Sequence, residues 1–274
     1  MSGTPTLLGV PFDGASSWRR GPARGPAAIR EALRAPSSNT WTEDGLDITA
    51  PGVLADGGDV ELLSDDGAAA RSAIEAAVGR ILDAGGRPLV LGGDHSITYP
   101  VLRAVGPRFP GLTVLHFDAH SDLYHDFEGD PYSHACPFAR VMEQGFAVRL
   151  LQFGIRTLSR HQREQAAKFA VEIREMRHWT GPESVSVAGP VYLSLDLDAL
   201  DPAFIAGINH PEPGGLSVRD VVTMIQRLEG RLVGADVVEL SPPEDLSPRS
   251  ALVAAKFVKE ITAAMHRCPA GNSR

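Results

Sequence analysis

The sequence predicts an α/β fold in which helices cover both faces of a central parallel sheet. Short apolar runs alternate with amphipathic segments along all 274 residues, and this alternation is typical of a parallel sheet with crossover helices. No second composition regime, internal repeat or low-complexity block interrupts the pattern. A single domain over residues 1–274 is therefore the simplest interpretation.

The expected strands are the short apolar runs, whose lengths suit buried strands. Gly and Pro residues, 28 and 21 in number, are scattered along the chain and indicate turns rather than linkers. In chain order the expected strands are Thr6–Val10, Pro88–Leu91, Leu112–Phe117, Leu150–Gly154, Val191–Asp196 and Ala235–Leu240.

The expected helices are the amphipathic segments between those runs. The last of them repeats apolar residues at helical spacing, through Leu252, Val253, Phe257, Val258 and Ile261. In chain order the expected helices are Pro26–Leu33, Ala68–Leu82, Pro137–Glu143, His161–Phe169, Ser217–Leu228 and Ser250–Met265.

The bulk composition limits the partners and the location of the chain. A net charge of -8 argues against nucleic acid or an anionic membrane surface as a partner. No stretch approaches the ~20 apolar residues that span a bilayer, and the N-terminal residues do not resemble a signal peptide. The two cysteines, Cys136 and Cys268, have no CxxC spacing. We therefore expect a cytoplasmic protein without a disulfide framework.

The run VLHFDAHSDL carries the first candidate metal ligands. Asp118, His120 and Asp122 alternate directly after an apolar strand. If the strand geometry continues through them, all three side chains point to one side. Three ionisable groups on one face repel or desolvate one another unless a cation joins them. The spacing therefore indicates a divalent metal site.

Two further runs place ligands at other strand ends, where parallel sheets bind ligands. VYLSLDLDALDP carries Asp196 and Asp198, and PLVLGGDHS ends in a Gly-Gly turn followed by Asp94 and His95. A single strand-end Asp is typical of a cap or a turn, but the set together favours ligation. Its carboxylate-rich chemistry favours Mn²⁺. Four Asp and two His exceed the needs of one ion, so we expect two ions that activate one water.

At these residues the sequence resembles the ureohydrolase family, which contains arginase and agmatinase. GGDHS (Gly92–Ser96), FDAHSDL (Phe117–Leu123) and SLDLDALDP (Ser194–Pro202) match its three metal motifs. The similarity runs from GVPFDGASSWRRGPARGPAAIRE to ALVAAKFVKE and so covers essentially the whole chain. The runs YHDFEGDPYSHACPFARVMEQG and INHPEPGGLSVRDV look most like the arginases of plants and some bacteria, which are agmatinase-like in sequence.

The resemblance implies a three-layer α/β/α fold, a homotrimer or homohexamer, and two manganese ions per subunit. It implies His134 as a proton shuttle and Glu239 as the partner of the substrate guanidinium, and it places Asp122 among the catalytic residues as well as the ligands. The implied ligands are His95, Asp118, Asp122 and Asp196 for the first ion, and His120, Asp118, Asp196 and Asp198 for the second.

The implied reaction is hydrolysis of a guanidino C–N bond by a hydroxide that bridges the two ions. The leading substrate is arginine or a guanidino-modified arginine such as N-hydroxyarginine, which gives urea or hydroxyurea plus ornithine. Agmatine, which gives urea and putrescine, is the alternative. Positions Thr157 and Ser159 carry no acidic residue where animal arginases have one. A one-zinc deacetylase-like amidohydrolase would not need all six ligands, and a non-catalytic scaffold would not need His134.

Six other residues have simpler expected roles. For Cys136 and His116 we expect packing, the latter beneath the metal layer, although strict alternation would place His116 on the same side as Asp118. His125 and His210 flank the motif loops and are candidates for the pocket wall. For Gly92 and Gly93 we expect a tight turn rather than a phosphate cradle, because no GxGxxG or Walker pattern follows them.

Overall fold

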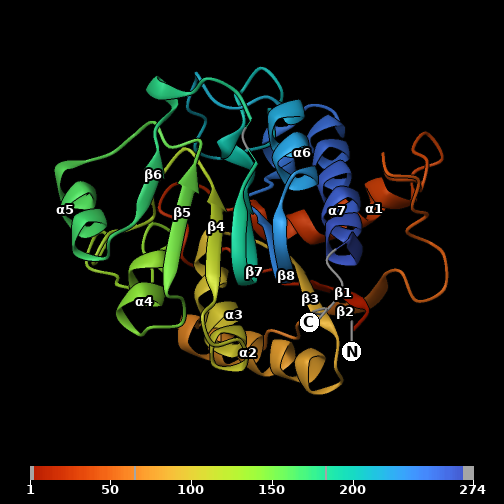
Figure 1. Ribbon diagram of the computed structural model, residues 1–274, viewed down its shortest axis with the longest axis horizontal. Coiled ribbons are helices and arrows are strands. Elements are labelled where there is room, and N and C mark those ends of the chain that lie inside the picture. Colours follow the sequence, from red (N-terminus) through yellow and green to blue (C-terminus); the bar gives the residue numbers. More distant parts are fainter. Residues whose placement is uncertain (1–2, 65, 183, 268–274) are drawn as a thin grey trace.

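The computed structural model describes residues 3–64, 66–182 and 184–267, and in them eight strands form one sheet (Figure 1). The strand order is β2-β1-β3-β8-β7-β4-β5-β6, and every pair is parallel. The strands are β1 (Pro5–Gly9), β2 (Ala55–Asp59), β3 (Arg87–Leu91), β4 (Thr113–Phe117), β5 (Arg149–Phe153), β6 (Glu172–Arg174), β7 (Ser186–Asp196) and β8 (Glu229–Val238).

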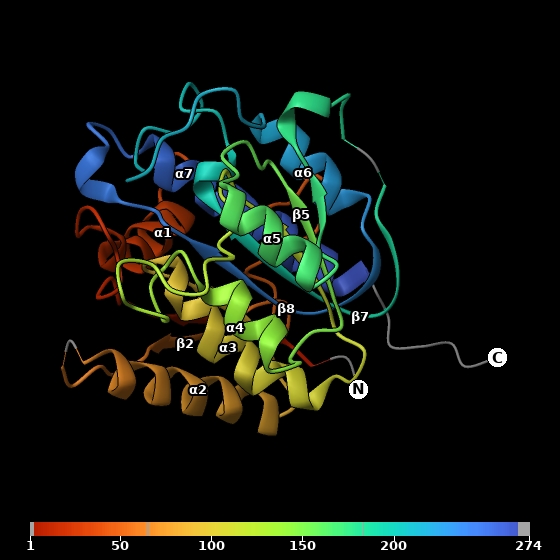
Figure 2. The same ribbon diagram turned by 90° about the vertical axis from the view of Figure 1, so that its left-hand side faces the viewer.

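Helices cover both faces of this sheet, which gives the expected three layers. They are α1 (Gly25–Arg34), α2 (Gly67–Asp83), α3 (Thr98–Val105), α4 (Pro137–Glu143), α5 (Arg160–Lys168), α6 (Val218–Gln226) and α7 (Arg249–Arg267). Figure 2 shows α2, α3 and α4 on one side of the sheet and α6 and α7 on the other. The two-residue period of a strand explains the layers: Leu89 and Leu91 pack into the core with α1, α6 and α7, whereas Val90 packs with α2 and α3.

The structure confirms the predicted α/β class and the twelve expected elements to within a few residues at most ends. It adds three elements that the sequence pattern does not predict. Strand β2 is exposed at all five positions and has no apolar run, and β6 has three residues at the opposite sheet edge. Helix α3 contains Pro100, which is tolerated because it lies in the first turn.

The bounds of two expected strands differ from the structure for identifiable reasons. Strand β7 begins at Ser186, before the apolar run, because it pairs there with the early start of β8. Strand β8 ends at Val238, two residues before the expected end. At Glu239 the backbone leaves the strand with a φ of 65°. Such left-handed backbone turns the chain at the carboxyl end of the strand.

No helix within the described ranges combines the length and the apolar character that crossing a bilayer requires. Cys136 is buried and free, and burial raises the pKa of its thiol to about 12. These features agree with the packing role expected for this residue. Cys268 lies outside the described residues.

Candidate metal centre

The candidate site lies on four neighbouring strands at the centre of the sheet: β3, β8, β7 and β4. Their carboxyl ends meet at one edge, so the loops that follow them converge. His95 follows β3, Glu239 follows β8, Asp196 ends β7 and Asp118 follows β4. Motifs as far apart as residues 95 and 239 thus become neighbours.

The turn after β3 brings His95 into place. A Cβ added to Gly93 would lie 1.7 Å from the Phe12 carbonyl oxygen, so only glycine allows this approach. The Gly93 carbonyl accepts the Glu239 N–H at 2.9 Å, and the Glu239 Oε1 atom accepts the His95 N–H at 2.8 Å. The Gly-Gly pair is therefore a tight-packing turn, as expected, and it couples the ends of β3 and β8.

Three carboxylates surround one nitrogen of His95. Its Nδ1 atom lies 3.1 Å from one oxygen each of Asp118, Asp122 and Asp196. Burial opposes a charged ring, but these carboxylates raise the pKa of His95 well above its ordinary value. The field at Nδ1 therefore favours positive charge.

The hydrogen bonds of His95 show which of its two ring nitrogens is available to bind a cation. Buried Asp236 accepts hydrogen bonds from the hydroxyls of Thr98, Tyr192 and Ser194. Since Ser194 donates its single hydrogen there, its oxygen accepts from the His95 Nε2–H at 3.0 Å. In the neutral ring, Nδ1 then carries the lone pair, and it faces three carboxylates without a hydrogen-bond partner.

A lone pair among carboxylates is unfavourable without a cation. Atoms bound at about 2.1 Å to an octahedral ion lie about 3.0 Å apart when adjacent, close to the observed 3.1 Å. The donor set of His95 therefore fits a divalent metal.

The second half of the site is built around His120. Its Nδ1 atom lies 3.1 Å from Asp198 Oδ2 and 3.3 Å from Asp118 Oδ1. The two oxygens of Asp118 thus face different histidines, since Oδ2 faces His95. Asp196 places Oδ2 toward His95, while its Oδ1 accepts the Asp198 N–H at 2.8 Å. All six predicted ligands are brought together, with Asp118 between two nitrogen donors.

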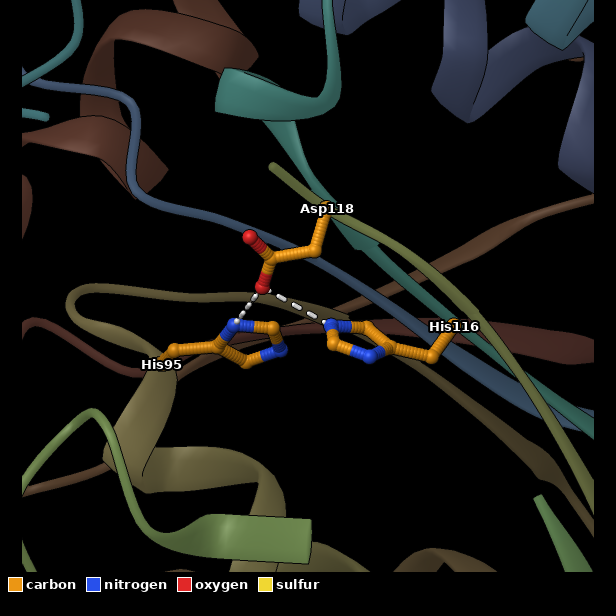
Figure 3. A group of neighbouring side chains, drawn as sticks. All are labelled: His95, His116 and Asp118. Carbon is orange, nitrogen blue, oxygen red and sulfur yellow. Dashed lines mark hydrogen bonds and ion pairs between the residues drawn. The ribbon is translucent and has the colours of Figure 1, made fainter. Parts of the chain in front are cut away.

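A third histidine, His116, reaches the same carboxylate from beneath. Figure 3 shows the rings of His95 and His116 directed at one oxygen of Asp118. The His116 Nε2 atom lies 2.8 Å from that oxygen, and the ring is fully buried. Burial, which outweighs the carboxylate of Asp118, lowers the pKa of His116. The expected packing position beneath the metal layer is confirmed, but the ring also contacts a ligand.

A cavity of about 280 Å³ opens above the ligands. Glu239 lines it with an Oε2 atom that is buried and has no hydrogen-bond partner. His134 lies beside it, with Nδ1 3.5 Å from Glu239 Oε1 and Nε2 2.8 Å from the Ser17 hydroxyl. Burial alone would lower the pKa of His134, but the contact with Glu239 and nearby carboxylates raise it to about 9.

Two site residues hold unusual backbone conformations. Asp122 and Glu239 have φ angles of 49° and 65°, a region that residues other than glycine rarely adopt. Such strain persists where surrounding contacts fix the backbone, and it clusters at functional sites. Here both carboxyl side chains line the cavity.

Some pocket residues gave no recognisable sequence signal. Ser17, Gln162 and Glu212 line the cavity but belong to no ligand-like motif. The loop that carries Ser17 is held by Asp94, which accepts the Ala15 N–H at 2.9 Å. The sequence places Asp94 next to His95 but does not indicate this contact.

The two candidate wall histidines have different outcomes. His210 lines the cavity and stacks on His134 at 4.9 Å between ring centroids. His125 is not among the lining residues, and its ring instead contacts Glu143 and Arg140.

Comparisons with known proteins agree with the fold and the site. The arginase family model matches residues 4–264. The mitochondrial arginase of Medicago truncatula is 46% identical over 97% of this chain and 83% of its own length. A solved structure of an arginase from Medicago truncatula superposes with a TM-score of 0.90, at 43% identity over 96% of this chain and 88% of that chain. Arginase 2 of Arabidopsis thaliana, named chloroplastic/mitochondrial, is 46% identical over 96% and 81%. An agmatinase of Bacillus anthracis is 32% identical over 93% and 89%.

The names of these relatives correct the expected cytoplasmic location. The similar arginases of Medicago truncatula and Arabidopsis thaliana are named for mitochondria or chloroplasts, which points to an organelle rather than the cytoplasm. The expectation was wrong because cysteine usage reports only a reducing environment. It does not distinguish one reducing compartment from another.

Proposed function

The chain belongs to the arginase family of metal-dependent amidinohydrolases, and on that premise we propose that it hydrolyses arginine to urea and ornithine. Relatives that are 46% identical are named arginases, whereas a relative named agmatinase is 32% identical. The reaction consumes one water, and its two products separate at the guanidino C–N bond next to the side-chain carbon.

The free Oε2 atom of Glu239 is the observation that carries this proposal. A buried carboxylate oxygen without a partner is costly unless a ligand satisfies it. This oxygen lies in the wall of the cavity above the metal ligands. A planar guanidinium offers N–H donors that match a carboxylate. Glu239 would therefore hold the scissile group over the ligands.

We propose manganese for both ions, because hard carboxylate oxygens with two imidazoles suit it. His95, Asp118, Asp122 and Asp196 would hold the first ion, and His120, Asp118, Asp196 and Asp198 the second. When bound, two such ions lower the pKa of water so that hydroxide is present near neutral pH. The remaining chemistry belongs to the side chains of the cavity.

His134 would supply the proton that the reaction needs. An amine leaves poorly until it is protonated, and a positioned imidazolium provides this proton. In the metal-free protein, contact with Glu239 helps raise the pKa of His134 to about 9, which favours the protonated ring near neutral pH. The Ser17 hydroxyl, 2.8 Å from Nε2, and Glu239, on the Nδ1 side, hold the ring at the cavity.

Agmatine remains the second candidate substrate because of the lining of the cavity. Among the described lining residues none is Lys or Arg, so the carboxylate of arginine would rely on neutral donors such as Ser17, Thr157 and Gln162. Glu212 supplies a further carboxylate in this wall, which suits the amino group that both compounds carry. N-hydroxyarginine shares the arginine backbone and differs only at the reacting end.

The test is turnover of the manganese-loaded protein on arginine, N-hydroxyarginine, agmatine and 4-guanidinobutyrate, with products identified by mass. We expect the highest kcat/KM with arginine. A preference for agmatine would replace the proposed substrate and keep the reaction class. Two bound ions with no turnover on any of the four compounds would refute the proposed function.

We also propose that the chain forms a single domain and assembles as a homotrimer or homohexamer. The proposal on assembly follows from the resemblance to the family rather than from any contact in this chain. Light scattering coupled to size-exclusion chromatography would measure the mass, and a monomer of 29.2 kDa would refute it.

A further inference from the structure

His116 occupies a position from which it could ligate a metal or support a ligand. Its Nε2 atom lies 2.8 Å from Asp118 Oδ2, and the same oxygen lies 3.1 Å from His95 Nδ1. The two rings therefore converge on one oxygen (Figure 3). Only a nitrogen without a hydrogen can bind a metal, so the tautomer of His116 decides its role.

Gln152 fixes that tautomer. One atom of its amide lies 2.7 Å from the Ser121 carbonyl oxygen and 2.9 Å from His116 Nδ1. A carbonyl oxygen only accepts, so this amide atom is the nitrogen, and its two hydrogens reach Ser121 and His116. The opposite amide orientation would place two acceptor oxygens 2.7 Å apart. The Nδ1 atom of His116 is therefore the acceptor, and Nε2 carries the hydrogen.

We propose that His116 is a positioning residue whose Nε2–H donates to Asp118 Oδ2, and that it is not a metal ligand. This bond uses one lone pair of Oδ2 and leaves the other for the ion beside His95. The Oδ1 atom is oriented separately by the His120 N–H at 2.6 Å. His95 has the same tautomer, because Ser194 accepts from its Nε2–H, but it directs the bare Nδ1 atom toward Asp118, whereas His116 directs its N–H there. Two buried histidines that look alike thus have different tasks.

The inference rests on the proposed two-metal site, so its test measures metal binding and not activity. His116→Gln keeps an N–H donor at a similar reach, whereas His116→Met has a similar length and no donor. Mn²⁺ alone is titrated into each metal-free variant, and free Mn²⁺ is counted by electron paramagnetic resonance. Loss of a hydrogen bond to a ligand weakens metal binding about 10- to 100-fold.

We expect two ions in the wild type and in both variants, with weaker binding in His116→Met and near wild-type binding in His116→Gln. An unchanged dissociation constant in His116→Met would overturn the inference. Loss of one ion from both variants would also overturn it, because His116 would then be a ligand. Fewer than two ions in the wild type would instead refute the two-metal site itself.

Gln152→Met gives an independent test that does not require replacing the histidine. If Gln152 acts through His116, this change weakens Mn²⁺ binding in the wild-type background and has little further effect in the His116→Gln background. Equal effects in both backgrounds would show a merely structural role and overturn the inference. The thermal stability of the metal-free variants serves as the folding control.

Discussion

Replacing Glu239 with glutamine changes one atom in the wall of the cavity. Glu239 Oε1 accepts the His95 N–H at 2.8 Å, and Oε2 has no partner. The amide oxygen of the variant must keep the bond to His95, so the amide nitrogen replaces Oε2. A guanidinium that enters the cavity then meets an N–H donor where it needs an acceptor.

The magnitude follows from the loss of a charged hydrogen bond. Hydrogen bonds to charged groups contribute about 1.5–3 kcal/mol, and each 1.4 kcal/mol is about tenfold. The lost acceptor alone therefore lowers kcat/KM about 10- to 150-fold. The amide N–H of the variant would also face the N–H groups of the guanidinium, and buried donors without an acceptor cost additional free energy. This range is therefore a lower limit.

Urea release from arginine measures this effect, with metal content determined on the same preparation. Glu239→Gln should still bind two ions, because Glu239 is not among the proposed ligands. Glu75→Gln removes the same charge from α2, where Glu75 pairs with Arg103 of α3, and should leave kcat/KM unchanged. A Glu239→Gln enzyme within threefold of the wild type would refute the assigned role of Glu239.

The remaining predictions concern the ligands and the proton. Asp118→Asn should lower manganese occupancy and abolish urea release together, because Oδ2 of Asp118 faces His95 and Oδ1 faces His120. Full turnover would exclude the two-metal assignment. His134→Gln should reduce kcat about 10²- to 10⁴-fold while both ions stay bound, and metal loss would show that His134 is misassigned. The pKa of His134 is raised from 6.5 to about 9 on folding, so its stabilising contribution is present below pH 6.5 and lost as pH rises through 9. The melting temperature of metal-free wild type should therefore exceed that of His134→Gln more at pH 6 than at pH 10, and a constant difference would contradict this linkage.

The sequence predicts the layers and the ligands because both leave periodic or local patterns. Buried parallel strands are apolar runs, and the ligands stand at fixed offsets after β4 and β7. Strand β2 left no such pattern, since its ADGGD run is exposed and pairs only with β1. Its place at the sheet edge depends on long-range pairing, which short windows of sequence do not contain.

The contacts that orient the ligands could not be predicted in the same way. Asp236 lies within the apolar run of β8, and Gln152 within that of β5, where a polar residue alone signals only that something must satisfy it. Their partners, Ser194 and His116, stand on other strands, so only the strand order and register bring them together. In that register Ser194 pairs with both His116 and Asp236, and the row continues to Gln152 on β5. The tautomers of His95 and His116 are thus determined by the sheet beneath the motifs, and a chain could retain every ligand yet bind metal poorly if this row were changed.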